Sequence, residues 1–456
     1  MPALSFPLSR SWRCLTGLLF VAGFVPAKAR AVTADLSAEI TRNVATDYPS
    51  LEALYQHLHA HPELSLQEKE TAARIASEWR TAGFQVTEGF GGYGVVAVLK
   101  NGPGPTLLLR TDLDGLPVKE ETGLPYASKV RARDAAGVDV PVMHACGHDV
   151  HMTVLVGTAR QLAALRNRWS GTLVLIGQPA EEKGLGAQAM LEAGLYARFG
   201  KPDWAVAIHD SATLPAGSVG LVEGYAMANV DNLDILVRGV GGHGGYPNTT
   251  KDPIVLASRI VLALQTIVSR EIRPIDPAVV TVGSFNGGTK HNIVPDEVKL
   301  QLTLRSYSDD VRRHLLAAVE RICRGEAIAA GMPEDRMPVV TQLNPANATP
   351  ALYNDPALTR RIRETLAGSL GSDRVRTIDP EMGGEDFGQF GRTAERIPLC
   401  LIRVGVVLPA HLAESERTGK PLPSLHSSKF APVPDPSLKT GVTALTTAAL
   451  NLLSRR

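Results

Sequence analysis

A short run of the chain concentrates side chains that bind transition metals. Residues 143–151 read Met-His-Ala-Cys-Gly-His-Asp-Val-His, which places one thiol, three imidazoles and a carboxylate close together. Cysteine and histidine are common ligands of first-row metals. We expect an extended Cys146-Gly147-His148 segment that directs the thiol and the imidazole to one face. The alternative, a set of capping and packing groups, would bury several polar side chains without compensation. The run therefore predicts a metal site.

Two pairs of acidic residues each follow an apolar, strand-like run. They are Asp112 with Asp114, and Glu181 with Glu182. Open α/β sheets carry their sites at the carboxyl ends of strands. There, one glutamate can bind metal while its neighbour takes a proton from bound water. An Asp-x-Asp pair can bind metal or orient a ligand imidazole. Taken alone, a Glu-Glu pair is usually a solvated surface pair.

Two histidines far apart in the chain are further candidate ligands. His209 follows the apolar run 204–208, and His426 lies near the C-terminus. A lone histidine is more often a satisfied surface or core residue than a ligand. These two become informative only in combination with the run at 143–151, because several imidazoles and carboxylates together match the ligands of a transition metal.

The elements that would position these groups alternate between helix and strand. Apolar residues recur at helical spacing between residues 47 and 81, with a break at His61-Pro62. Strand-like runs at 94–99, 106–110 and 172–176 then alternate with helix-like runs at 153–165 and 187–193. This alternation predicts an α/β domain with a largely parallel sheet covered by helices.

A second unit interrupts this domain. Between about residues 231 and 340 the pattern becomes strand, helix, two strands, helix and strand, which is the β-α-β-β-α-β order of a ferredoxin-like unit. A polar, proline-bearing stretch at 344–350 follows it. We therefore predict catalytic-domain segments at 35–228 and 344–456, with an insertion at 229–343. The chain resumes near Ala351 and ends in a helix.

Length and charge restrict the classes of partner. A chain of 456 residues is long enough for two domains. Its 47 lysines and arginines nearly cancel 46 aspartates and glutamates, so no strong field favours nucleic acid or an acidic membrane surface. We expect a small-molecule partner.

The N-terminus resembles a signal peptide. Arg10 and Arg13 precede an apolar run at 15–25, and Ala27-Lys28-Ala29 resembles an A-x-A cleavage site. The run is shorter than the roughly 20 residues that span a bilayer. We predict a signal peptide at 1–29, cleavage near Ala29, and a periplasmic or secreted protein that is not membrane-bound after cleavage.

The three cysteines that follow the predicted signal peptide do not form a disulfide pattern. Cys146, Cys323 and Cys400 are odd in number and far apart in sequence, unlike the framework of a small secreted domain. At least one thiol therefore needs another explanation, and metal binding by Cys146 would supply it.

Together these motifs resemble the M20 metallopeptidase family, and within it the aminoacylase-like amidohydrolases, which include hippurate and auxin-conjugate hydrolases. The matching segments occur in order at 59–65, 110–117, 143–151, 181–182, 241–244, 292–295, 382–387 and 425–428. The resemblance implies a zinc-peptidase-like catalytic domain. It also implies that the insertion is a lid and dimerisation domain, so that the protein is a homodimer or a higher homo-oligomer.

The resemblance also implies roles at the metal site. Two divalent ions per subunit (Zn, Mn, Co or Ni) would be bound by Cys146, His148, Glu182, His209 and His426. The thiolate would stand where other branches have a bridging aspartate. Glu181 would be the general base, and Asp114 would orient the site as a supporting carboxylate. Asp112 stands where other branches carry a histidine ligand.

Three lid residues are implied to contact the substrate. His243 would reach a neighbouring subunit's site and stabilise the oxyanion, while Asn292 and Arg305 would bind substrate, Arg305 by a bidentate grip on a carboxylate. A solvated surface pair is the alternative for Arg305. Asn248 stands where the family usually has histidine, so an atypical acyl preference is expected.

The sequence thus predicts a metal-dependent amidohydrolase that cleaves N-acyl amino acids to a carboxylic acid and a free amino acid. A metallo-carboxypeptidase or dipeptidase is the alternative within the same chemistry. A non-catalytic ligand-binding protein that reuses the fold is the alternative from another class.

Overall fold

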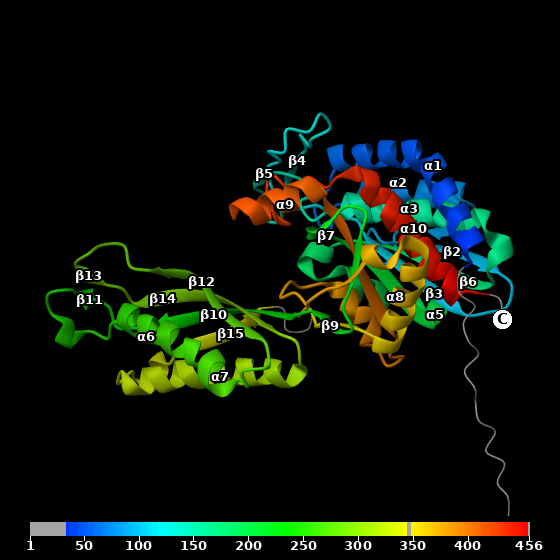
Figure 1. Ribbon diagram of the computed structural model, residues 1–456. Helices are drawn as coiled ribbons and strands as arrows, with labels where there is room; N and C mark the ends of the chain where they lie inside the picture. The colour runs from blue at the N-terminus through cyan, green and yellow to red at the C-terminus, as the bar shows by residue number, and fades with distance from the viewer. Residues whose placement is uncertain (1–32, 344–347, 455–456) are drawn as a thin grey trace, which may run out of the picture.

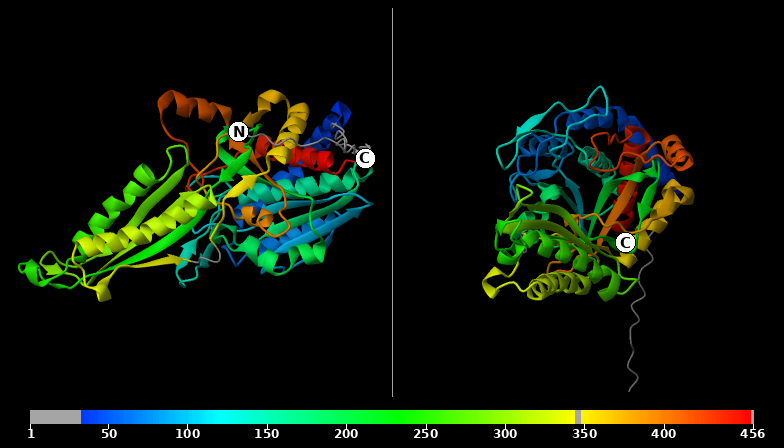
Figure 2. Two further views of the ribbon diagram at one scale, coloured as in Figure 1. Left: turned by 90° about the horizontal axis from the view of Figure 1, so that it is seen from below. Right: turned by 90° about the vertical axis from the view of Figure 1, so that its left-hand side faces the viewer.

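The computed structural model describes residues 33–343 and 348–454 (Figure 1). The signal peptide predicted at 1–29 lies outside the described residues. Two units are visible. A larger one contains both the first and the last elements of the chain, and a smaller one extends away from it (Figures 1 and 2). The α/β fold class predicted from the sequence is confirmed.

The larger unit is built on a ten-stranded sheet with a parallel centre. Its main path runs β1-β2-β6-β3-β7-β18-β16-β9, and β8 and β17 join beside β18. The five strands from β6 to β16 along this path pair in parallel, while β1, β2 and β9 pair antiparallel at the two edges. The bounds are β1 (Gln85–Thr87), β2 (Val95–Asn101), β3 (Thr106–Asp112), β6 (Gly171–Gln178), β7 (Trp204–Pro215), β8 (Val219–Leu221), β9 (Gly224–Met227), β16 (Leu352–Asn354), β17 (Val375–Thr377) and β18 (Leu399–Val407).

Helices cover both faces of this sheet, which explains why its central strands are almost continuously apolar. One buried cluster joins the sheet to α1 (Ala34–Ala60), α2 (Lys69–Thr81), α3 (His148–Ala164), α8 (Pro356–Leu370) and α10 (Pro434–Leu452). A second cluster packs the opposite face against α4 (Gly186–Glu192), α5 (Leu195–Phe199) and residues 387–390. A short hairpin of β4 (Arg131–Arg133) and β5 (Asp139–Pro141) and the helix α9 (Pro409–Thr418) lie outside these layers.

The predicted first helix is longer than its apolar pattern indicated. The pattern began near Asp47, but α1 begins at Ala34, where the Thr33 hydroxyl accepts the Leu36 N–H at 3.3 Å as an N-cap. The helix ends at Ala60, directly before the predicted break at His61-Pro62.

The smaller unit contains a four-stranded antiparallel sheet of order β12-β14-β10-β15. Along the chain its elements follow the predicted sequence: β10 (Asn229–Arg238), α6 (Pro253–Thr266), β12 (Ala278–Gly287), β14 (Glu297–Ser306), α7 (Asp309–Ala329) and β15 (Val339–Leu343). The first strand lies between the third and the fourth, as in ferredoxin-like units. Apolar residues of α6 and α7 pack on this sheet. The segment Pro253–Glu271 is long and apolar enough to cross a membrane, but one face of α6 is buried against the sheet.

A two-stranded ribbon forms the tip of this unit. β11 (Gly242–His243) pairs with β13 (Ile293–Val294). Figures 1 and 2 show this tip at the end of the unit farthest from the larger domain. We call the unit the lid and this ribbon the lid tip.

Candidate metal centre

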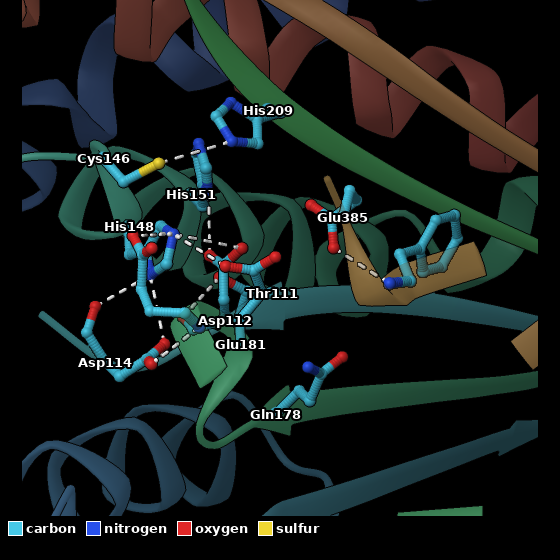
Figure 3. Close-up of polar contacts among 12 residues, drawn as sticks. Thr111, Asp112, Asp114, Cys146, His148, His151, Gln178, Glu181, His209 and Glu385 are labelled. Atoms are coloured by element: carbon cyan, nitrogen blue, oxygen red, sulfur yellow. Dashed lines mark hydrogen bonds and ion pairs between the residues drawn. The ribbon is translucent and has the colours of Figure 1, made fainter. Parts of the chain in front are cut away.

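The predicted ligands meet at the carboxyl ends of three parallel strands. β3 ends at Asp112, β6 ends at Gln178 just before the two glutamates, and β7 carries His209. The first turn of α3 supplies His148 from above these strand ends, and Figure 3 shows these side chains converging on one region. This placement follows the general rule for open α/β sheets.

The local geometry of the cysteine-histidine segment differs from the prediction. The segment is not extended: Gly147 has φ 73° and ψ 20°, and His148 is the first residue of α3. A Cβ atom on Gly147 would lie 2.4 Å from Oδ2 of Asp210. Glycine is therefore required both by the left-handed conformation and by the close approach of β7.

A strained turn presents the two glutamates. Ala180 has φ 49°, and its N–H donates to Oε1 of Glu68 at 2.7 Å. The N–H of Glu182 donates to Oδ2 of Asp114 at 3.1 Å. These hydrogen bonds connect the turn to Glu68, directly before α2, and to Asp114, which follows β3. The side chains of Glu181 and Glu182 are only about 10% and 9% exposed.

The ligand atoms form two overlapping groups that share the thiol. The first is Cys146, His148 and His209, and the second is Cys146, Glu182 and His426; within each, the ligand atoms lie within 4.8 Å of one another. Sγ of Cys146 lies 3.7 Å from Nε2 of His209, and Oε2 of Glu182 lies 3.7 Å from Nε2 of His426. Ligands bound to one tetrahedral zinc are separated by roughly 3.3–3.8 Å, given bond lengths of about 2.0–2.3 Å. The spacing therefore fits two ions that share Cys146.

The hydrogen bonds of the buried imidazoles of His148 and His209 leave Nε2 of each ring available to bind a metal ion. Nδ1 of His148 donates to the carbonyl oxygen of Asp114 at 2.8 Å, and Nδ1 of His209 donates to the carbonyl oxygen of Asp210 at 2.8 Å. Because a carbonyl can only accept, each Nδ1 carries the proton and each Nε2 has a free lone pair.

Two buried polar atoms at the site have the chemistry of metal ligands. Within the described part of the chain, Nε2 of His148 and Oε1 of Glu182 are buried and accept or donate no hydrogen bond. The two atoms lie 3.8 Å apart. Native proteins rarely leave such groups unpaired. The donor set therefore fits divalent metal ions.

The pKa shifts of the acidic groups at the site also favour bound cations. Burial, reinforced by Glu385 and Glu182, raises the pKa of Glu181 well above its ordinary value. Burial also raises the pKa of Glu182 to about 7, against the opposing effect of His148. Burial raises the pKa of the Cys146 thiol as well. These groups are costly to ionise together without positive charge beside them, and bound cations reverse that cost.

A buried arginine beneath the site was not singled out by the sequence motifs. Nη1 of Arg110 donates to Oδ2 of Asp112 at 2.7 Å, and Nη2 donates to Oε1 of Glu385 at 2.9 Å and Oδ1 of Asp386 at 3.2 Å. Nε donates to Oε1 of Gln178 at 3.0 Å. Arg110 thereby ties β3, β6 and residues 385–386 together.

His151, like Arg110, supports the site through hydrogen bonds and is not one of the ligands. The sequence grouped it with the potential ligands, but its Nδ1 lies 2.7 Å from Oδ1 of Asp112, and its Nε2 accepts the Asp210 N–H at 2.9 Å. Both ring nitrogens are therefore occupied. Its place one turn after His148 in α3 was the only signal of this role in the sequence.

The three lid residues lie in two different places. His243 and Asn292 are exposed at the lid tip, where the Gly244 N–H donates to the Asn292 carbonyl oxygen at 2.9 Å. Figure 1 shows the strands of this tip, β11 and β13, far from β7, the strand that carries His209. Arg305 is half-buried at the other end of β14, where a Cβ on Gly384 would lie 3.6 Å from its Nη1.

Comparison with known proteins agrees with this site. The peptidase family M20/M25/M40 matches residues 108–426. The hippurate hydrolase of Campylobacter jejuni is 36% identical over 344 residues, which cover 74% of this chain and 84% of that protein. Thermostable carboxypeptidase 1 of Saccharolobus solfataricus is 34% identical over 397 residues, which cover 85% and 91%.

A solved structure shows the same fold. The YxeP protein of Bacillus subtilis, described as a dinuclear metal binding peptidase from the M20 family, superposes with a TM-score of 0.71 at 28% identity and covers 90% of this chain and 99% of that one. The resemblance inferred from the motifs is therefore confirmed. The chain belongs to the peptidase family M20/M25/M40 and is a metal-dependent amidohydrolase of that family.

Proposed function

We propose that the protein hydrolyses N-acyl amino acids to a carboxylic acid and a free amino acid at a site with two divalent ions. The observation that carries the proposal is the position of Glu181. Its Oε2 lies 3.9 Å from Nε2 of His148, and its carboxylate could form a ligand group with His148 and Glu182, but it belongs to neither of the two groups that share Cys146. A carboxylate placed in this way is available for proton transfer.

Ions held by Cys146, His148, His209, Glu182 and His426 would supply Lewis-acid polarisation of the scissile carbonyl and would lower the pKa of the attacking water. Glu181 accepts a proton from the water and later delivers it to the leaving amine nitrogen. Burial beside Glu385 and Glu182 raises the pKa of Glu181, which suits a group that must both take and give a proton. Asp114 keeps His148 in the tautomer that presents Nε2.

Arg305 is the proposed anchor for the substrate carboxylate. Within the described residues no ion pair engages it, although burial lowers its pKa. A half-buried, uncommitted guanidinium can grip a carboxylate through two parallel hydrogen bonds. Such an anchor serves both an N-acyl amino acid and a peptide C-terminus.

A substrate panel separates these two classes. We expect turnover of N-benzoyl and N-acetyl amino acids, with little turnover of dipeptides, because a free peptide amine is an ammonium that needs its own anchor. Initial rates of the metal-loaded protein on both classes provide the measurement. Turnover of peptides alone would replace the proposal with a carboxypeptidase or dipeptidase.

We also propose that two copies complete each other's sites. The lid tip, with His243 in β11, lies at the end of the lid farthest from the larger unit (Figure 1), and it exposes Tyr246 (63%) and Ile293 (50%). A mixture of two inactive variants, His243→Ala and Glu181→Gln, should regain activity, since a mixed dimer contains one intact site. A mixture that stays inactive after subunit exchange would contradict shared sites.

A further inference from the structure

A buried histidine outside the ligand set lies between two carboxylates. Nδ1 of His59, in α1, lies 2.6 Å from Oδ2 of Asp149, and its Nε2 lies 3.0 Å from Oε1 of Glu120; all three side chains are fully buried. The rings of Tyr55 and Tyr126 flank the imidazole at centroid distances of 5.6 and 5.2 Å. Although burial opposes the charge, Asp149 and Glu120 raise the pKa of His59 to about 10. His59 is therefore a fixed cation at neutral pH.

One carboxylate of this trio belongs to the turn that carries a metal ligand. Asp149 directly follows His148 in the first turn of α3. Its Oδ1 accepts the Val150 N–H at 2.9 Å, so its Oδ2 is the atom available to His59. The contact ties the ligand-bearing end of α3 to α1.

The other carboxylate leads to the loop that carries His426. Oε2 of Glu120 accepts the Ser128 N–H at 2.6 Å, which closes the loop between these residues. The next residue, Glu121, donates its N–H to the carbonyl oxygen of Ser428 at 2.7 Å, and its side chain accepts the Ser428 hydroxyl at 3.3 Å. Ser428 lies two residues after the ligand His426.

His426 is the ligand that most needs such support. Its side chain is 55% exposed, whereas those of Cys146, His148, His209 and Glu182 are less than one tenth exposed. Its φ of 67° is an unfavourable left-handed conformation for a residue with a Cβ. The surrounding contacts must hold that conformation. Besides the Glu121 contacts to Ser428, the His426 N–H donates to the Ala145 carbonyl oxygen at 2.8 Å.

We propose that His59 is a positioning residue for the metal centre, which connects the turn of His148 through Asp149 to the loop of His426 through Glu120, Glu121 and Ser428. The inference rests on the proposed two-ion site. It assigns to His59 the task of keeping His426 within reach of the ion that it shares with Cys146 and Glu182. Groups that orient metal ligands in this way typically contribute 10- to 100-fold to metal affinity.

Stepwise metal titration of the metal-free protein tests this role. In His59→Gln we expect one of two binding steps for cobalt(II) to weaken by about 10- to 100-fold. The thiolate-to-cobalt absorption band should remain, because the other ion still binds Cys146. Activity should recover at excess metal, which a general loss of folding would not allow. The matched control is His57→Gln, an exposed histidine on the same helix whose ring lies beside that of His61.

Glu120→Gln provides a second, independent test that leaves the contact of His59 with Asp149 in place. We expect the same binding step to weaken, and the decision rests on this variant if His59→Gln does not fold. Wild-type affinity for both ions in the folded His59 and Glu120 variants would overturn the positioning role while leaving the metal centre intact. A wild-type protein without two metal-binding steps would overturn the proposed function itself.

Discussion

Glu181→Gln is expected to lower the rate of hydrolysis by about 10²- to 10⁴-fold without loss of bound metal. Glutamine keeps the size of the side chain but cannot accept a proton. The two ligand groups that share Cys146 do not include Glu181, so their ions should stay bound. The measurement combines kcat/KM with elemental analysis of the same sample.

The matched control for this variant is Glu192→Gln, which removes one exposed carboxylate from the nearby helix α4. There, Glu192 accepts a hydrogen bond from Gln188 in the same helix. Its activity should equal that of the wild type. Full activity of Glu181→Gln would remove Glu181 from the role of general base. Loss of metal in that variant would instead make Glu181 a ligand.

Arg110→Met is expected to destabilise the fold by about 3–5 kcal/mol. The guanidinium is fully buried, and its removal leaves Asp112, Glu385 and Asp386 without their shared cation. Burial raises the pKa of Asp386 to about 7 even with Arg110 present, so an uncompensated negative charge is costly at this position. The shift of the urea midpoint, converted with the measured m-value, gives the change in free energy of unfolding.

A second substitution checks the cause of this loss. Adding Glu385→Gln to the Arg110→Met chain removes one of the unpaired charges and should recover part of the stability. Arg376→Met, at an exposed arginine of β17, serves as the control and should change stability by less than about 0.5 kcal/mol. A similarly small change in Arg110→Met would show that the buried ion network does not stabilise the fold.

The organisation of the chain was predictable where it depends on local patterns. Alternating apolar runs indicated the parallel sheet, and the order of strands and helices between β10 and β15 indicated the lid. Acidic residues directly after β3 and β6 could be assigned to a common edge, because parallel strands end on the same side. One central strand, β18, was missed, although its nearly continuous apolar run is typical of a strand buried on both faces.

The details of the site depend on contacts between distant segments, and sequence patterns do not show these. The left-handed Gly147 is explained by Asp210, which approaches from β7. Glu120 and Asp149, which stabilise the positive charge of His59, are 61 and 90 residues away from it in the chain. The lid tip, with His243 in β11, lies at the end of the lid farthest from the larger unit (Figure 1). Only the assembled fold reveals this position.

Elemental analysis of the purified protein tests the metal centre most directly. We expect two divalent ions per wild-type chain, and at most one in Cys146→Ala, because the thiol belongs to both ligand groups. Activity should be lost on chelation and restored when metal is added back. A wild-type protein that hydrolyses its substrate with no bound metal, and that is insensitive to chelators, would contradict this account.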